Sequence, residues 1–325
     1  MNNEQIDPAT IKAGVVGLGL MGSSIAAALL VAGHTVVAIA PLPAEEQTAP
    51  ALIRDHLTLC GNAGLLSSPL ETYLSRLTVS GDYASLSDCR FVLECVVERK
   101  EIKAEVYARI AAVVSDETIV ASNTSAIPIS ILQQEIPHPE RFLGIHWAEP
   151  AYMTRFLEIT CGAETDMQHA TYAFDLAHYW GKEPTLLKKD IRGFVTNRLM
   201  YAVYREGLAL AEKGEATIAD MDKVFQYDAG AWMTLMGIFR RMDYIGLEDL
   251  ETILQNILPE LSNTNGVAPL MQQLIAAKAK GTQTSGGFYA YEGNEAKEWE
   301  EAFAAFNKDI DQLAARYPSA TKTYA

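Results

Sequence analysis

The sequence lacks an excess of basic residues, and it also lacks long apolar runs. Its 325 residues include 26 Lys and Arg against 41 Asp and Glu, a formal net charge of −15. Proteins that bind nucleic acids need clustered basic side chains for their phosphate contacts, so this composition argues against that class. The longest apolar run, residues 25–33, is too short to cross a membrane, and the first ten residues do not resemble a secretory signal. We therefore expect a cytoplasmic protein that binds neither nucleic acid nor membrane.

Cysteine is also scarce. The four cysteines are Cys60, Cys89, Cys95 and Cys161, and none of them forms a CxxC pair. Two of the four lie in apolar runs typical of strands, where a reduced thiol behaves as a small apolar side chain. The sequence therefore predicts buried free thiols and no metal centre.

Apolar residues make up 49% of the chain, and their pattern predicts two folded domains with different secondary structure. In the first half, short apolar runs alternate with helical patterns, which is typical of a parallel, doubly wound α/β sheet. The expected strands are 13–16, 35–39, 91–97, 118–121, 143–146, 155–160 and 184–187, with a helix at 166–181. Beyond them the pattern is helical throughout, with expected helices at 194–213, 218–226, 249–257 and within 292–325. We place the domains at 1–188 and 189–325.

A glycine motif follows the first expected strand directly. It reads Gly17-Leu18-Gly19-Leu20-Met21-Gly22 and opens a helix that ends near Gly33. In a dinucleotide site the first glycine makes the tight turn, the second lets the backbone approach a pyrophosphate, and the third lets the helix pack on the sheet. The helix N-terminus adds N–H donors and the positive end of a dipole. The motif in this position predicts a dinucleotide site.

One part of such a site is missing from the second strand. An NAD site normally carries Asp or Glu at the end of that strand, where the carboxylate bonds the adenosine ribose. Here Ala40 follows the strand, without an arginine that could hold the 2′-phosphate of NADP. Glu45 and Glu46, a few residues on, are the alternatives, and NAD is the favoured cofactor.

An ordered series of motifs resembles the 3-hydroxyacyl-CoA dehydrogenase family and its relatives that act on free acids, L-gulonate 3-dehydrogenase (lambda-crystallin) and carnitine dehydrogenase. The resemblance covers almost the whole chain. It implies a Rossmann-type doubly wound domain followed by an all-helical domain like the C-terminal domain of 6-phosphogluconate dehydrogenase, an NAD cofactor and a homodimer. The matching runs are GLGLMG at 17–22, LECVVE at 93–98, SNTS at 122–125, GIHWAEP at 144–150, FLEI at 156–159, GFVTNR at 193–198, MDYIGL at 242–247 and SGGFY at 285–289.

The resemblance also implies catalytic roles. His146 matches the general base that takes the hydroxyl proton, and Glu158 matches the carboxylate that pairs with it. A histidine suits this role because its ordinary pKa lies near working pH. Ser125 and Asn197 match polar groups that contact the substrate oxygen.

Further matches concern the cofactor. Glu98 and Lys103 correspond to positions close to the nicotinamide, and Asn123 lies in the matched SNTS run. For Lys103 the alternative is an ordinary lysine on the solvated face of a helix.

Three departures from the family pattern bear on the substrate. Glu149 stands where the family usually has asparagine, and residues 45–51 carry two carboxylates where acyl-CoA enzymes tend to have lysines. Gly237-Ile238 stands where the family has Gly-Pro, and it is followed by Arg240 and Arg241, which with Arg155 are tentative substrate contacts. We therefore expect NAD-dependent oxidation of a small free 3-hydroxy acid, such as a sugar acid. The alternatives are a 3-hydroxyacyl-CoA dehydrogenase of fatty-acid β-oxidation and a catalytically idle, NAD-binding structural protein.

Overall fold

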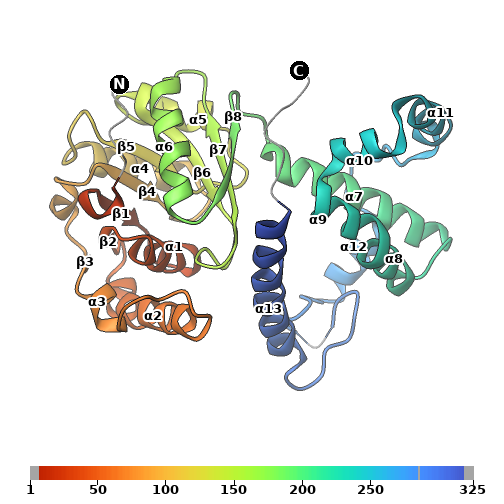
Figure 1. Ribbon diagram of the computed structural model, residues 1–325, viewed down its shortest axis with the longest axis horizontal. Helices are drawn as coiled ribbons and strands as arrows, with labels where there is room; N and C mark the ends of the chain where they lie inside the picture. Colours follow the sequence, from red (N-terminus) through yellow and green to blue (C-terminus); the bar gives the residue numbers. More distant parts are fainter. Residues whose placement is uncertain (1–6, 285, 318–325) are drawn as a thin grey trace. The chain divides into compact units, whose positions relative to one another are not determined.

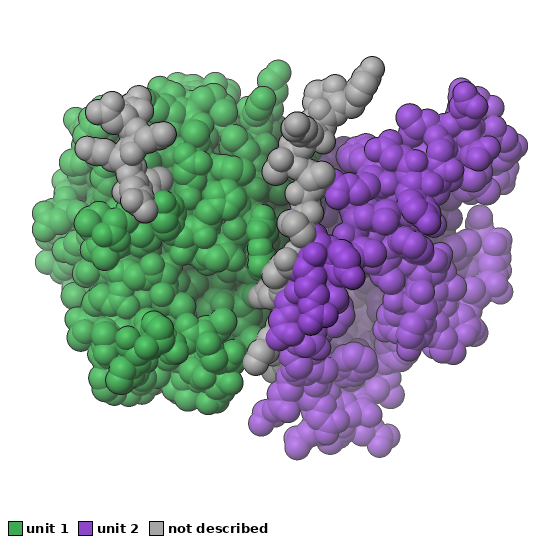
Figure 2. All heavy atoms as spheres, in the orientation of Figure 1, with its two compact units in different colours: residues 1–195 green, residues 196–325 purple. Residues whose placement is uncertain are grey.

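The computed structural model describes residues 7–284 and 286–317, and the chain forms two compact units, Met1–Val195 and Thr196–Ala325 (Figure 2). The domain boundary expected after residue 188 lies in the segment between the last strand and the first helix of the second unit. Ser285 of the SGGFY run and the chain after 317 lie outside the described residues. No helix in the described part of the chain is both long and apolar enough to cross a membrane.

The first unit is built on one eight-stranded sheet with the order β3-β2-β1-β4-β5-β6-β7-β8 (Figure 1). All neighbouring strands are parallel except the antiparallel pair β6 and β7. The first six strands in the order 3-2-1-4-5-6 are those of a Rossmann fold, which confirms the expected fold class. The strands are β1 (Lys12–Val16), β2 (Thr35–Ile39), β3 (Leu77–Ser80), β4 (Phe91–Glu94), β5 (Ile119–Ser122), β6 (Phe142–Trp147), β7 (Phe156–Cys161) and β8 (Glu183–Leu187).

Helices cover both faces of this sheet because its central strands are apolar on both sides. Every residue of β4 and β5 is buried. One apolar core joins alternate strand residues to α1, α2 and α6, and a second core joins the other strand residues to α4 and α5. The helices of this unit are α1 (Leu20–Val31), α2 (Pro43–Asn62), α3 (Leu70–Leu74), α4 (Lys100–Ala111), α5 (Ile129–Leu132) and α6 (Met167–Tyr179).

One predicted strand ends earlier than expected, and one strand was not predicted. The strand expected over 91–97 ends at Glu94, because the backbone N–H of Val96 turns back and donates to the Glu94 side chain. The short strand β3 was not predicted at all. It lies at the edge of the sheet, and its four residues are exposed or half-buried, so no apolar run marks it.

The second unit is helical, as the sequence predicts, and its described residues contain isolated β-bridges but no strand. The helix expected over 218–226 is shorter as an α-helix and continues as a π-helix over Phe225–Ala229. The α-helices are α7 (Phe194–Lys213), α8 (Ile218–Val224), α9 (Gly230–Met236), α10 (Ile238–Ile245), α11 (Leu247–Ile257), α12 (Pro269–Ala276) and α13 (Glu295–Arg316).

Candidate active site

The carboxyl ends of four parallel strands bring the matched motifs of the first unit to one edge of the sheet. The glycine loop follows β1, the LECVVE run ends β4, the SNTS run ends β5, and His146 lies near the end of β6. Ligands of open α/β sheets bind at this edge, where the strand order reverses between β1 and β4. The topology alone therefore gathers these motifs around one place.

The glycine loop has the form that a dinucleotide requires. Gly17 has a φ of +92°, and a Cβ on Gly22 would lie 1.8 Å from the Gly17 carbonyl oxygen, so both positions need glycine. A Cβ on Gly19 would meet no atom within 4 Å, which leaves open space beside the backbone at the N-terminus of α1. No side chain caps that N-terminus. The free N–H donors and the open approach at Gly19 fit a pyrophosphate. Leu18 is buried, whereas the Leu20 side chain is exposed and Met21 is half-buried.

His146 and Glu158 are directly opposite each other on the antiparallel strands β6 and β7. Side chains of such a pair lie on the same face of the sheet. The His146 Nδ1 and Glu158 Oε2 atoms are 3.5 Å apart, which is longer than a good hydrogen bond. The other carboxylate oxygen of Glu158 accepts from the backbone N–H of Val195 at 3.0 Å.

The surroundings of this pair are apolar. Phe156 meets the His146 ring edge-on, with centroids 5.6 Å apart, and the ring of the buried Phe194 lies 6.1 Å away. The side chain of Glu158 is 1% exposed and that of His146 16%. A buried carboxylate beside a partly exposed imidazole is suited to hold one tautomer and to stabilise the protonated ring.

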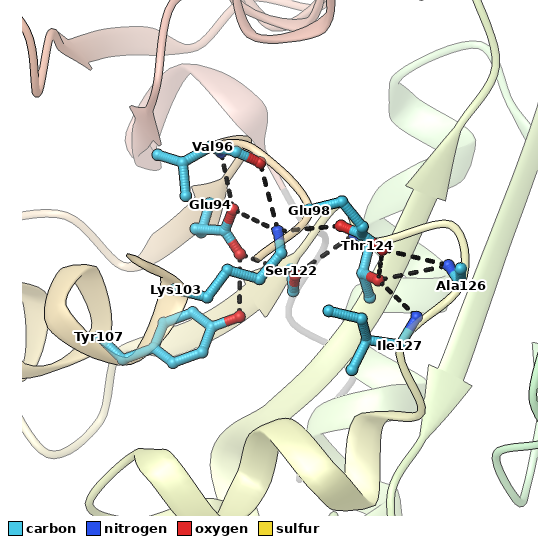
Figure 3. A network of polar contacts seen from close by, with 9 residues as sticks. All are labelled: Glu94, Val96, Glu98, Lys103, Tyr107, Ser122, Thr124, Ala126 and Ile127. Carbon is cyan, nitrogen blue, oxygen red and sulfur yellow. Dashed lines mark hydrogen bonds and ion pairs between the residues drawn. The ribbon is translucent and has the colours of Figure 1, made fainter. Parts of the chain in front are cut away.

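A buried polar network lies at the ends of β4 and β5 (Figure 3). Glu94, which is fully buried, accepts from Lys103 Nζ at 2.7 Å, from the Tyr107 hydroxyl at 2.9 Å and from the Ser122 hydroxyl at 2.8 Å. Burial and the charge of Glu94 raise the pKa of Tyr107 well above its ordinary value, so this hydroxyl remains a donor. Glu94 was not among the residues predicted from the sequence. A carboxylate inside an apolar strand was the available signal, because such a group needs a buried partner.

Glu98 extends the network toward the loop after β5. It pairs with Lys103 at 3.3 Å, and it accepts from the Thr124 hydroxyl and from the backbone N–H of Ala126. Burial alone would raise the pKa of Glu98, but the Thr124 hydrogen bond and the charge of Lys103 lower it below the ordinary value. Lys103 is 1% exposed, so the alternative of a solvated helix lysine was wrong.

The remaining predicted residues of the first unit are more dispersed. The Asn123 side-chain oxygen accepts from the backbone N–H of Trp147 and thus ties the end of β5 to β6. Ser125 is exposed on the same loop. Glu149 is exposed and lies beyond the end of β6. Burial, together with the charges of Cys60 and Glu149, raises the pKa of Tyr152 to about 12. Arg155 forms an ion pair with Glu183.

In the second unit, Asn197 is half-buried in the first turn of α7, and the two arginines lie on α10. The Arg241 guanidinium lies over the rings of Trp232, at 4.6 Å, and Tyr244, at 5.7 Å, while Arg240 is exposed. Stacking of this kind fixes a guanidinium and leaves its in-plane donors directed outward.

The described residues contain no cluster of three or more His, Cys, Asp or Glu side chains that could hold a metal ion. The four cysteines are free thiols; Cys60, Cys89 and Cys161 are buried, and Cys95 is half-buried.

Comparison with known proteins places this architecture in a family. A family model described as 3-hydroxyacyl-CoA dehydrogenase, NAD binding domain, matches residues 12–191, and the model of the corresponding C-terminal domain matches residues 193–291. The chain belongs to the 3-hydroxyacyl-CoA dehydrogenase family. It is therefore an NAD-dependent oxidoreductase that acts on CH–OH groups, and the expected cofactor is confirmed.

Individual relatives of this dehydrogenase differ in substrate. It is 33% identical over 284 residues to 5-formyl-3-hydroxy-2-methylpyridine 4-carboxylate 5-dehydrogenase of Mesorhizobium japonicum, covering 87% of this chain and 91% of the relative. It is 30% identical to the mitochondrial hydroxyacyl-coenzyme A dehydrogenase of Sus scrofa, covering 85% and 90%. A solved structure of the pyridine carboxylic acid 5-dehydrogenase, described as an NAD⁺-dependent dismutase, superposes with a TM-score of 0.85 at 31% identity over 93% of this chain and 97% of that one.

Proposed function

We propose that this dehydrogenase oxidises the CH–OH group of a small free hydroxy acid, with His146 as general base and Glu158 as its buried partner. The observation that carries the proposal is the cross-strand pair itself, with a partly exposed imidazole 3.5 Å from a buried carboxylate at the carboxyl edge of the sheet. When bound, NAD supplies the oxidant that accepts the hydride from the substrate carbon.

His146, supported by Glu158, accepts the proton of the substrate hydroxyl. Glu158, held by the Val195 N–H, favours the His146 tautomer with its hydrogen on Nδ1. Nε2 is then the nitrogen that takes the substrate's hydroxyl proton. The buried carboxylate stabilises the imidazolium that results, as the aspartate of a hydrolase triad does.

Other residues bind and orient the substrate and the cofactor. We assign Ser125 and Asn197 to the substrate oxygen, where a hydrogen bond strengthens as that oxygen becomes a carbonyl. Within the loop of residues 17–22, the backbone at the N-terminus of α1 binds the pyrophosphate, because the N–H groups of Gly17 and Leu18 already donate to Ile39 and Glu45. Glu98, Lys103 and Asn123 belong to the cofactor's nicotinamide end, at the ends of β4 and β5.

The substrate class follows from charge. Residues 45–51 carry two carboxylates and no cation, which disfavours the phosphates of coenzyme A. A small acid needs one cation to bind its carboxylate. Arg241 is the strongest candidate, because the rings of Trp232 and Tyr244 hold its guanidinium in place. Arg155 is a weaker candidate because Glu183 already neutralises it. Arg240 and Glu149 remain further tentative contacts. A relative that acts on a pyridine carboxylate supports this direction.

The second candidate is a 3-hydroxyacyl-CoA dehydrogenase, favoured by relatives of that activity such as the enzyme of Sus scrofa. The idle, NAD-binding structural protein that the sequence left open is not supported, because the chain belongs to a family of NAD-dependent oxidoreductases. The homodimer and the cytoplasmic location stay predictions. For the homodimer, the support is α7, which exposes Leu199, Met200 and Val203 within its own chain.

The test replaces the base. His146→Gln should lower kcat for NADH formation by about 10²- to 10⁴-fold, because the proton then has no acceptor, and should leave the NADH dissociation constant unchanged. His178→Gln, on the exposed face of α6, is the matched control and should keep full activity. Retention of most of the wild-type kcat/KM by His146→Gln would remove His146 from the mechanism.

A further inference from the structure

The cofactor's adenosine ribose has no carboxylate where a Rossmann site usually offers one. β2 ends at Ile39, and the next residue, Ala40, is 4% exposed and carries only a methyl group. In the common arrangement this position holds Asp or Glu, which accepts hydrogen bonds from the ribose hydroxyls and disfavours a 2′-phosphate. Because this dehydrogenase uses NAD, another group must perform that selection.

A carboxylate from the next helix reaches the glycine loop instead. Glu45 lies in the first turn of α2, and its Oε2 accepts a hydrogen bond from the backbone N–H of Leu18 at 3.2 Å. Leu18 is the second residue of the GxGxxG motif, so the carboxylate lies at the rim of the cofactor loop. Glu45 is half-buried, and within the described residues its Oε1 accepts no hydrogen bond.

The neighbouring glutamate is directed elsewhere. Glu46 is exposed, and its Oε1 accepts from the backbone N–H of Gly81 at 3.1 Å. Gly81 follows β3, which lies on the side of β2 away from β1 and the glycine loop. Glu46 thus ties α2 to the edge of the sheet, and only Glu45 faces the loop.

The start of α2 also offers no lysine or arginine that could bind the 2′-phosphate of NADP. Among lysines and arginines, α2 carries only Arg54, which lies in its fourth turn and pairs with Glu71 at 2.9 Å. A 2′-phosphate would bring a charge of about −1.5 to −2 against the carboxylate of Glu45, which forms no ion pair within the described residues. The local charge therefore opposes NADP.

We propose that Glu45 is the residue that binds the adenosine ribose and selects NAD over NADP. Oε2 keeps the hydrogen bond from Leu18, which fixes the carboxylate, and Oε1 accepts from a ribose hydroxyl. The carboxylate that selects the cofactor thus lies in the first turn of α2 and not at the end of β2. Unlike the substrate assignment, this inference rests only on the cofactor and on the contacts of Glu45.

The experiment measures binding and needs no substrate. Glu45→Ala, Glu45→Gln and, as the matched control, Glu46→Gln are each titrated with NADH, with NADPH and with reduced nicotinamide mononucleotide, which lacks the adenosine. Glu45→Ala should weaken NADH binding by about tenfold to a hundredfold, the usual effect of losing a charged hydrogen-bond partner. Glu45→Gln should fall between Glu45→Ala and wild type, because a neutral amide oxygen still accepts.

The ligand pattern separates this role from a structural one. The mononucleotide should bind every variant as it binds wild type, and the preference for NADH over NADPH should fall in both Glu45 variants but not in Glu46→Gln. Unchanged or tighter NADH binding in the Glu45 variants would overturn the proposal. So would equal weakening of NADH and the mononucleotide, which indicates a distorted loop, or a larger effect in Glu46→Gln. None of these outcomes depends on whether the substrate is a free acid.

Discussion

At the residue scale, the buried Lys103 shows what a single sequence reveals and what it hides. Its spacing to Val106, Tyr107 and Ile110 places it on the buried stripe of α4, so the signal for burial was present in the sequence. A lysine on such a stripe is usually read as solvated because its charge is costly to bury. The partner that makes burial tolerable, Glu94, lies on a separate strand, and their contact depends on the packing of α4 against β4.

Removal of this lysine should destabilise the first unit strongly. Lys103→Met leaves Glu94 buried without its cation, and such a loss costs about 3–5 kcal/mol in the free energy of unfolding. Urea unfolding measures the change. The control is Lys100→Met on the same helix, where the pair with Glu135 is partly exposed and its loss costs about 0–1 kcal/mol.

The double variant Lys103→Met/Glu94→Gln completes this test. Because it removes both charges together, it should recover part of the stability lost in Lys103→Met. A Lys103→Met protein as stable as Lys100→Met would show that Glu94 does not need the ammonium group.

At the element scale, the strand–loop–helix unit could be predicted and the site's geometry could not. The bounds of β2 agree with the sequence, and β1 begins one residue earlier than expected, because apolar runs and glycines mark these elements directly. The pairing of His146 with Glu158 was inferred from resemblance alone. Its physical cause is the register of β6 on β7, which no periodicity in either strand specifies. Phe156 and Phe194, which flank the His146 ring, were missed because their contacts with it depend on tertiary packing.

The glycine loop gives a prediction that separates folding from binding. Gly19→Ala should fold as well as wild type, because its Cβ meets no atom within 4 Å and its φ of −69° suits any residue. NADH binding should weaken at least about tenfold, since the methyl group occupies the approach of the pyrophosphate. Thermal unfolding and an NADH titration measure the two effects.

Gly22→Ala is the contrasting variant for this loop. Its Cβ would lie 1.8 Å from the Gly17 carbonyl oxygen, so the fold itself should suffer. Wild-type NADH affinity in Gly19→Ala would mean that the pyrophosphate does not approach the backbone at that glycine.

At the scale of the whole molecule, charge bears on which acid the enzyme accepts. The net charge of −15 means that an anionic ligand depends on local cations. Coenzyme A would have to be held at a helix start that offers Glu45 and Glu46, whereas a small acid needs only one arginine. Each like-charge contact at a partly exposed position costs about 1 kcal/mol or less, so two or three of them shift the preference by roughly tens-fold. The family shared with acyl-CoA enzymes could be predicted from sequence, but this preference could not be settled there.

The most direct measurement compares kcat/KM of the wild-type enzyme for free acids and for a thioester. NADH absorbance follows the oxidation of L-gulonate, of L-carnitine and of hydroxylated pyridine carboxylates, beside the reduction of acetoacetyl-CoA. We predict turnover of at least one free acid with a kcat/KM roughly tens-fold above that for the thioester. Efficient turnover of acetoacetyl-CoA with little activity on every free acid would contradict this account and make the protein a 3-hydroxyacyl-CoA dehydrogenase in activity as well as in family.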